Sequence, residues 1–207
     1  MTDIQQYTAY IPVIKESETV AFALELEGES LLQRAAGTAK SASCVSRVVV
    51  RTKHKAAKKA ASQLGIEVED AMARDLRDPH FLVSLNYPFM NAAHFEQLIK
   101  AKAKTVRTLT PQRHHPVGAF IARDGRMDFS ATLDSPTWRA LDEKKFYQPI
   151  DALSLHYAPA ETKRAYLVVD EVSSLKVTAP EELALASLVL SRGLSDQENG
   201  ETLWQSP

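Results

Sequence analysis

The first 70 residues alternate between short apolar runs and helical patterns, and this alternation constrains the fold more than any other feature. Tyr7–Val13 is an apolar run typical of a strand, and Ser30–Lys40 places Leu and Ala side chains at helical spacing. The run "SRVVVR" at Ser46–Arg51 suits a strand that is buried on both faces. Lys53–Leu64 indicates a second, cationic helix, and Ile66–Val68 a third short strand. This βαβαβ order predicts a parallel sheet.

The rest of the chain continues the alternation. Further strands are expected at Phe81–Leu85, Val106–Thr110, Ala152–His156 and Ala165–Val169, with a turn at Asn86–Pro88. Helices are expected from the cap Asn91 to Lys102, near Ser135–Leu141 within a less regular stretch from Pro111 to Pro149, and over Pro180–Leu190. Gly65 is expected to cap the helix before it. We therefore predict an α/β protein with a three-layer α/β/α sandwich and a mostly parallel sheet.

Length and composition favour one cytoplasmic domain. The 207 residues, 44% of them hydrophobic, can bury one ordinary core, and no linker divides them. We expect a single domain over residues 1–193 and a polar, frayed tail over 194–207. The single Cys44 excludes an internal disulfide framework and fits a reducing compartment. The N-terminus lacks a secretory pattern, and no apolar run reaches the roughly 20 residues that span a bilayer, so no membrane partner is expected.

The charge balance gives no general attraction to nucleic acid. Lys and Arg number 25 and Asp and Glu 26. Two basic stretches, Arg51–Lys59 and Lys100–Arg107, hint at anionic ligands, including RNA or DNA. The second interleaves its cations with Ala, Thr and Val rather than with stacking aromatic residues, so nucleic acid is not the favoured partner.

Several common catalytic patterns are missing from the sequence. There is no Gly-x-Ser-x-Gly nucleophile elbow, no His-Glu-x-x-His zinc motif and no Walker phosphate loop. Seven glycines are few for a protein that depends on glycine-rich loops. These absences disfavour hydrolases of the Ser-His-Asp type, zinc enzymes and P-loop nucleotidases.

Five segments occur in the order found in acylneuraminate cytidylyltransferases (CMP-sialic acid synthetases), and the chain resembles that family along most of its length. They are "YIPV", "LEGESLLQRAAGTAKSASCVSRVVVRT", "LVSLNYPFMNAAHFEQLI", "YQPIDALSLHY" and "KVTAPEELALASLVL". The resemblance implies the nucleotide-diphospho-sugar transferase fold and a homodimer. It also implies a reaction in which CTP or another NTP activates a sugar acid or sugar phosphate, with Mg²⁺, and releases pyrophosphate.

The resemblance also implies roles for individual residues by their position. It implies phosphate contacts and catalysis by Lys15 and Ser17, substrate contacts by Arg51, Asn86, Arg113 and His115, and Mg²⁺ ligands at Asp151 and Asp170. Electrostatic clamping of phosphates is most of what a protein contributes to such transfers.

The chemistry-bearing positions depart from the family pattern. Ile14 stands where the family has an Arg, and the following "TVAFALELEG" holds no cation. Thr178 stands where the family has a metal-associated Asp, and Pro149–Asp151 replaces Glu-Asn-Gly. Glu182 keeps an acid at a helix start, which is a structural role.

Two alternatives therefore stay open. One is an active nucleotidyltransferase, and the other is a catalytically degenerate relative that acts as a nucleotide-binding, regulatory or structural partner protein. An open pocket with Lys15 and two carboxylates would support turnover, whereas a pocket plugged by Phe22 or Leu24 would support loss.

Overall fold

A single large sheet organises the chain. The computed structural model describes residues 6–70, 76, 78–112, 120–123, 126–129, 146–158, 160, 162–193 and 202–205. Ten strands form the sheet in the order β5-β4-β1-β6-β10-β7-β11-β12-β9-β8. Their bounds are β1 Tyr7–Pro12, β4 Val45–Arg51, β5 Glu67–Glu69, β6 His80–Val83, β7 Ala103–Gln112, β8 Phe120–Arg123, β9 Arg126–Phe129, β10 Phe146–His156, β11 Thr162–Val168 and β12 Thr202–Gln205. Arg113, His115 and the helix predicted near Ser135–Leu141 lie outside the described residues.

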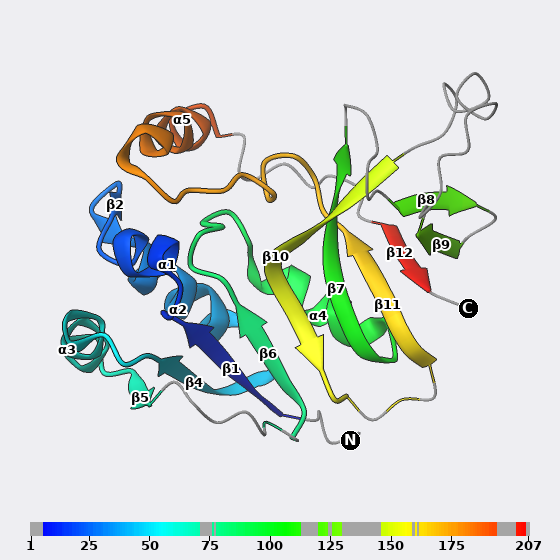
Figure 1. Cartoon of the computed structure of the whole chain (residues 1–207), viewed down its shortest axis with the longest axis horizontal. Helices are drawn as coiled ribbons and strands as arrows, with labels where there is room; N and C mark the ends of the chain where they lie inside the picture. The colour runs from blue at the N-terminus through cyan, green and yellow to red at the C-terminus, as the bar shows by residue number, and fades with distance from the viewer. Residues whose placement is uncertain are drawn as a thin grey trace.

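The strand directions confirm the predicted, mostly parallel sheet. β5, β4, β1 and β6 run parallel to one another, and β7 and β11 are also parallel. The exception among these central strands is β10, which inserts antiparallel between β6 and β7 (Figure 1). The predicted βαβαβ unit therefore forms one edge of the sheet, as β5, β4 and β1.

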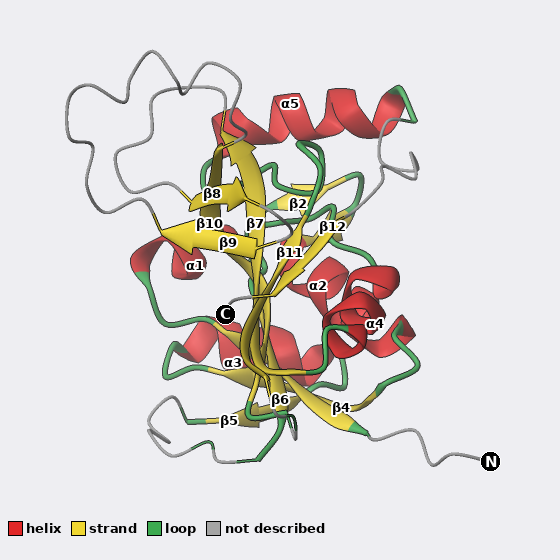
Figure 2. Cartoon of the chain, turned by 90° about the vertical axis from the view of Figure 1, so that its right-hand side faces the viewer, coloured by secondary structure: helices red, strands yellow, loops and turns green. Residues whose placement is uncertain are grey.

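Helices lie on both sides of this sheet, as predicted for a three-layer α/β/α protein. α2 (Leu31–Ser41) and α4 (Ala92–Lys100) lie on one side, and the short α1 (Glu16–Ala21) lies on the other (Figure 2). The core fills the space beneath α2 and α4; there Phe81 of β6 packs on Phe95 of α4 with ring centroids 5.0 Å apart. α3 (Lys55–Gln63) contacts β5, and α5 (Pro180–Ser191) contacts β2 and lies at the upper left in Figure 1. No helix among the described residues is long and apolar enough to span a bilayer.

Local signals fix the helix ends close to their predicted positions. The backbone N–H of Gln33 donates to Ser30 Oγ at 3.1 Å, and that of His94 donates to Asn91 Oδ1 at 3.3 Å. Gly65 follows α3 with φ 62°, the left-handed geometry of the predicted cap. α4 ends at Lys100, two residues earlier than expected, since Lys102 has φ 48° and leaves the helical region.

Several elements differ from the prediction. β7 and β10 are much longer than expected and include Pro111 and Pro149, whose missing N–H groups argue against strands in the sequence. The expected phosphate loop contains α1 and then a β2–β3 hairpin (Glu25–Leu26 and Glu29–Ser30). Within the tail, Thr202–Gln205 forms β12 and pairs with β11, so this part is not frayed.

Candidate functional site

A cavity of about 390 Å³ opens at the carboxyl ends of β1 and β6. At this point the strand order reverses, because the chain runs from β1 to β4 on one side while β6 flanks β1 on the other. Open α/β sheets bind ligands at such switch points. Three segments form the wall: the end of β1 and the following loop, the end of β6 and its loop, and β10. The lining is Pro12, Ile14, Lys15, Ser17, Glu18, Leu82, Val83, Ser84, Asn86, Tyr87, Asp151, Ser154 and Lys176.

Four of the predicted site residues meet in this cavity: Lys15, Ser17, Asn86 and Asp151. The Nζ atom of Lys15 lies 3.8 Å from Oδ2 of Asp151, and the side chains are 69% and 87% exposed. An ion pair this exposed contributes little to stability, so both groups remain available to a ligand. Lys176 adds a second cation from the loop after β11.

The loop after β1 is organised by a buried carboxylate. Glu18 is only 5% exposed, and its Oε2 accepts hydrogen bonds from the backbone N–H groups of Ile14 and Lys15, both at 2.8 Å. These two backbone N–H groups are at the start of the loop, and the Glu18 carboxylate already accepts hydrogen bonds from both. Phe22 lies against His54 with centroids 5.6 Å apart, and neither Phe22 nor Leu24 belongs to the described lining. The cavity is therefore open.

A bulge in β10 places Asp151 at the cavity. The pairing of β10 with β7 breaks between Ile150 and Ser154. The hydroxyl of Thr108, fully buried, lies 3.0 Å from both the Ile150 and Leu153 carbonyl oxygens, and the Ser84 N–H donates to the Ala152 carbonyl at 2.9 Å. Bulges often redirect side chains beside active sites. Here the bulge directs an acid to the mouth of the site.

Asn86 gives the cavity wall an unpaired acceptor. The residue is 3% exposed, and its backbone carbonyl accepts from Val177 N–H at 2.7 Å. Its Oδ1 is buried, and no hydrogen-bond partner is found for it among the described residues. Such orphan groups are rare in folded proteins and mark places where a ligand can bind. In the neighbouring Tyr87, burial and the Asp151 carboxylate raise the pKa, which keeps the phenol protonated.

The other predicted residues lie elsewhere. Arg51 places its guanidinium 5.4 Å from the centre of the Tyr10 ring, and its Nε lies 3.8 Å from Oε2 of Glu69. Asp170 accepts hydrogen bonds from the Ser173 backbone N–H and hydroxyl, each at 2.8 Å. Both of its carboxylate oxygens are thus engaged in a turn.

The helix-start acid of α5 has the structural role expected from the sequence. Oε2 of Glu182 accepts hydrogen bonds from the Thr178 hydroxyl at 2.9 Å and the Ala179 N–H at 3.1 Å. These contacts lower the pKa of the Glu182 carboxyl, with the Thr178 backbone N–H as the main cause. Thr178 is therefore part of a helix cap.

The cavity also contains residues that sequence reasoning missed, namely Glu18, Ser84, Tyr87, Ser154 and Lys176. Ser84 and Tyr87 follow β6 directly, and Lys176 follows β11 after a short turn, so their position after a strand was an available signal. Glu18 gave none, because its helix was not predicted. Within the described parts of the chain, no three His, Cys, Asp or Glu side chains gather as metal ligands would.

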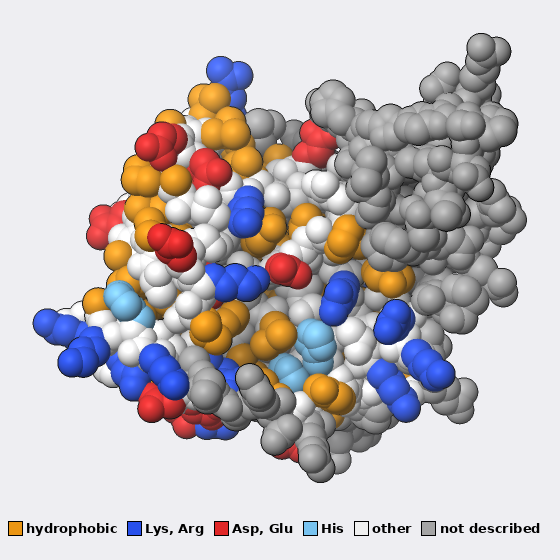
Figure 3. All heavy atoms as spheres, viewed as in Figure 1, with side chains coloured by type: hydrophobic (Ala, Val, Ile, Leu, Met, Phe, Trp, Pro, Cys, Tyr) orange, Lys and Arg blue, Asp and Glu red, His pale blue; other side chains and the backbone are white. Residues whose placement is uncertain are grey.

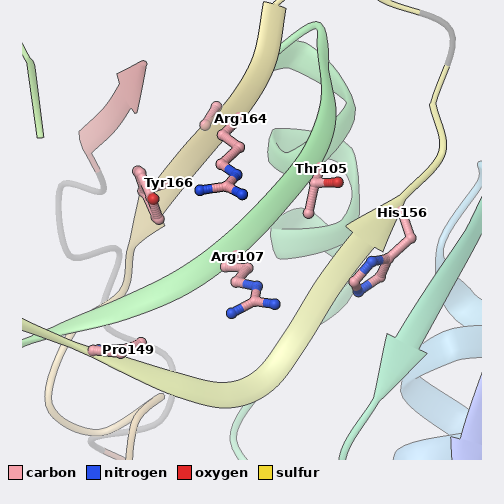
Figure 4. A pocket seen from close by; sticks show the side chains of 7 residues that line it. Thr105, Arg107, Pro149, His156, Arg164 and Tyr166 are labelled. Atoms are coloured by element: carbon pink, nitrogen blue, oxygen red, sulfur yellow. The ribbon is translucent and has the colours of Figure 1, made fainter. Parts of the chain in front are cut away.

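A second cavity of about 320 Å³ lies on the sheet face opposite α4 (Figure 4). It is lined by Thr105, Arg107, Pro149, His156, Arg164, Ala165 and Tyr166. His156 stacks on His80 with centroids 5.4 Å apart, and its Nε2 lies 2.8 Å from the Ser154 hydroxyl. Burial, then His80 and Arg107, lower the pKa of His156 to about 4. Ser154 lines the first cavity, so this hydrogen bond joins the two.

Comparison with known proteins identifies the fold. No protein-family model matches the chain, and no curated protein matches it significantly. A solved CMP:2-keto-3-deoxy-manno-octonic acid synthetase complexed with CTP superposes with TM-score 0.70 and 11% identity, covering 91% of this chain and 100% of that one.

Two further structures give the same result. The 4-diphosphocytidyl-2C-methyl-D-erythritol synthase of Anaerococcus prevotii DSM 20548 gives TM-score 0.63 and 16% identity, covering 92% of this chain and 98% of that one. Another 4-diphosphocytidyl-2C-methyl-D-erythritol synthase gives TM-score 0.58 and 15% identity, covering 90% of this chain and 99% of that one. At such identities the likeness establishes the fold alone, and no acylneuraminate enzyme is among these three. The chain has the nucleotide-diphospho-sugar transferase fold that these cytidylyltransferases share.

Proposed function

We propose that the protein is a nucleotidyltransferase that activates a sugar acid or sugar phosphate with CTP. An oxygen of the sugar substrate attacks the α-phosphorus of the nucleotide. The bond between the α-phosphorus and the oxygen that bridges it to the β-phosphorus breaks, and pyrophosphate leaves. The observation that carries the proposal is the open cavity at the switch point, lined by Lys15, Ser17, Asn86 and Asp151. Its position in a fold shared with a synthetase that was solved in complex with CTP supports a nucleotide as the ligand.

In this proposal each side chain has a distinct role. The Lys15 ammonium and the Ser17 hydroxyl contact the phosphates, with Lys176 as a second cation. The unpaired Oδ1 of Asn86 accepts a hydrogen bond from the base. Cytosine offers an exocyclic amino group, whereas uracil offers a carbonyl at the same position. The acceptor thus supports CTP over UTP.

The proposal assigns the binding of Mg²⁺ to one side chain, Asp151. Magnesium is usually held by one or two carboxylates together with substrate phosphates and water. Asp151 is exposed at the cavity and fits this requirement, while Asp170 does not, because both its oxygens accept hydrogen bonds from Ser173. When bound, the ion would neutralise phosphate charge. A homodimer and a cytoplasmic location complete the proposal, as the resemblance and composition predict.

The second candidate is a protein that binds a nucleotide or another partner without turnover. The Glu18 carboxylate favours it, because it already occupies two backbone donors at the head of the loop. Lys15 is the only Lys or Arg between Ile14 and Gln33. A triphosphate would therefore meet a sparse set of cations.

One experiment separates these candidates. Thermal unfolding is followed with CTP, UTP, ATP and GTP, each with and without Mg²⁺, and pyrophosphate release is then measured with a panel of sugar acids and sugar phosphates. A ligand that binds only the native state raises the midpoint by mass action. A rise with CTP together with pyrophosphate release supports the transferase. A rise without release across the panel supports binding alone, and no rise with any triphosphate at millimolar concentration contradicts both nucleotide readings.

A further inference from the structure

The second cavity is built from a regular grid of side chains on three neighbouring strands. β10 and β11 both pair with β7, so residues in register across them point to the same face. One row across the strands is His156, Thr105 and Arg164, and the next is Ser154, Arg107 and Tyr166. Figure 4 shows the guanidinium groups of Arg107 and Arg164 on the side of the sheet that also carries the His156 imidazole.

This grid concentrates positive charge without neutralising it. Arg107 and Arg164 are diagonal neighbours on adjacent strands, and both are exposed. Neither forms an ion pair among the described residues, and the described lining of the cavity contains no Asp or Glu. Like charges this close repel each other, and an anion bound between the two guanidinium groups would attract both and offset that repulsion. In Figure 3, Lys and Arg side chains gather on the lower right of this face, whereas acids and bases mix on its left.

The grid also supplies the geometry for holding an oxyanion. Arg164 and His156 stand two strands apart, a separation of about 10 Å, with Thr105 between them. An anion over Thr105 lies within reach of both side chains and of Arg107 in the next row. Guanidinium groups match the planar, paired oxygens of carboxylates and phosphates. The hydroxyl of Thr105 offers a further hydrogen bond.

We propose that this cavity binds a small molecule through its phosphate or carboxylate group, held by Arg107 and Arg164 with His156 at its side. A volume of about 320 Å³ suits a small organic anion rather than a macromolecule. The site is distinct from the switch-point cavity, and it does not depend on the proposed transferase activity.

The test measures thermal stability and calorimetric binding with inorganic phosphate and with citrate, at constant ionic strength set with chloride and with no nucleotide present. We expect binding to the native protein, weakened about tenfold by Arg164→Gln and lost in the Arg107→Gln/Arg164→Gln double variant. Arg164→Lys retains the charge but loses the two parallel N–H donors of the guanidinium group, so this variant should bind the anion more weakly than the native chain. Lys163→Gln is the matched control, since it removes one exposed charge on the other face of β11.

The outcomes are decisive in either direction. Binding of phosphate alone or citrate alone, lost in the double variant, supports the site and tells which oxyanion it takes. Equal binding by the native chain and the double variant overturns it, as does no binding of either anion. If Lys15→Gln abolishes binding while the double variant retains it, the anion occupies the switch-point cavity, and the proposal is wrong.

Discussion

The two cavities lie on the same side of the sheet and meet at Ser154 and His156, yet their electrostatics differ. In the switch-point cavity, Lys15 and Lys176 face Glu18 and Asp151, so cations and acids balance. The sheet-face cavity has two Arg side chains and a His, with no acid in its described lining.

The difference shows that position in a fold and charge carry separate information. The switch point marks where a ligand can enter between the strands. The charge distribution marks where an anion is most stabilised, and here that is the sheet face rather than the switch point. The proposed function therefore assigns nucleotide recognition to Lys15, the Asn86 acceptor and a metal at Asp151, rather than to a dense cationic loop.

Removing Lys15 should have the largest effect on this comparison. If the switch-point cavity is catalytic, Lys15→Ala lowers the rate of pyrophosphate release roughly 100-fold, since one charged contact to the transition state is worth about 2.7 kcal/mol. Initial rates at saturating CTP measure it, with Lys53→Ala as an exposed control outside the described lining. Loss of turnover in the Arg107→Gln/Arg164→Gln variant instead would exchange the roles of the two cavities.

Thr108→Val should have the next largest effect, a loss of stability through the bulge that carries Asp151 to the first cavity. The substitution leaves the buried Leu153 groups and the part-buried Ile150 carbonyl without their hydroxyl partner and costs about 2 kcal/mol of unfolding free energy. Urea unfolding measures the loss. Thr110→Val is the matched control, because Thr110 is buried on the same strand and has no side-chain hydrogen bond among the described residues. Equal destabilisation by both variants would show that the hydroxyl does not hold the bulge.

Acidification should destabilise the protein through the second cavity. Burial lowers the pKa of His156 to about 4, and the pKa of the neighbouring His80 is also lowered, mainly by burial. Between pH 6.5 and 4 the unfolded chain therefore binds protons that the folded chain does not, so stability is complete above pH 6.5 and falls as pH decreases. The groups that face His156 are His80, Ser154, Arg107 and Tyr157.

We expect His156 to lower the unfolding free energy by on the order of 1 kcal/mol on acidification, after allowance for its partial exposure. Urea unfolding at several pH values measures the slope. His156→Gln should reduce the dependence of the unfolding free energy on pH and leave the contribution of His80. An unchanged slope in this variant would assign the effect to other groups.

Asp151→Asn should have the smallest effect on stability and a diagnostic effect on binding. Its ion pair with Lys15 is exposed, so the unfolding free energy changes by less than about 1 kcal/mol. Without Mg²⁺, CTP should bind more tightly, because a negative charge beside the phosphates is gone. Calorimetry with and without Mg²⁺ measures both. A Mg²⁺ dependence that survives the substitution would place the metal elsewhere.

The sequence predicted those elements whose signals are local. The βαβαβ unit, the caps Ser30 and Asn91 and the left-handed Gly65 follow from periodicity and short-range hydrogen bonding. Lys15, Ser17, Asn86 and Asp151 were named from their positions in the family resemblance, and the structure places all four at one cavity.

The elements that it could not predict depend on distant partners. β10 extends across Pro149 because β7 pairs with it from Phe146 to Ile150, whereas β6 pairs only with its Leu153–His156 end. The bulge depends on the Thr108 hydroxyl, which can donate to either of two carbonyl oxygens more than 40 positions away in the sequence. The cationic grid arises only when β7 and β11 come into register, and neither strand alone distinguishes Arg107 or Arg164 from any other surface cation.

The central position of β10 also determines the order in which the chain can fold. β6 and β7 are joined through α4, but the strand that separates them arrives more than 30 residues after β7 ends. Both described partners of β7, β10 and β11, come later in the chain. During synthesis the βαβαβ unit can pair early, whereas β7 has no neighbour until β10 emerges, and long-range pairing of this kind slows folding. Pulsed hydrogen exchange should therefore protect Val106 together with Leu155 and after Val49; earlier protection of Val106 would contradict this order.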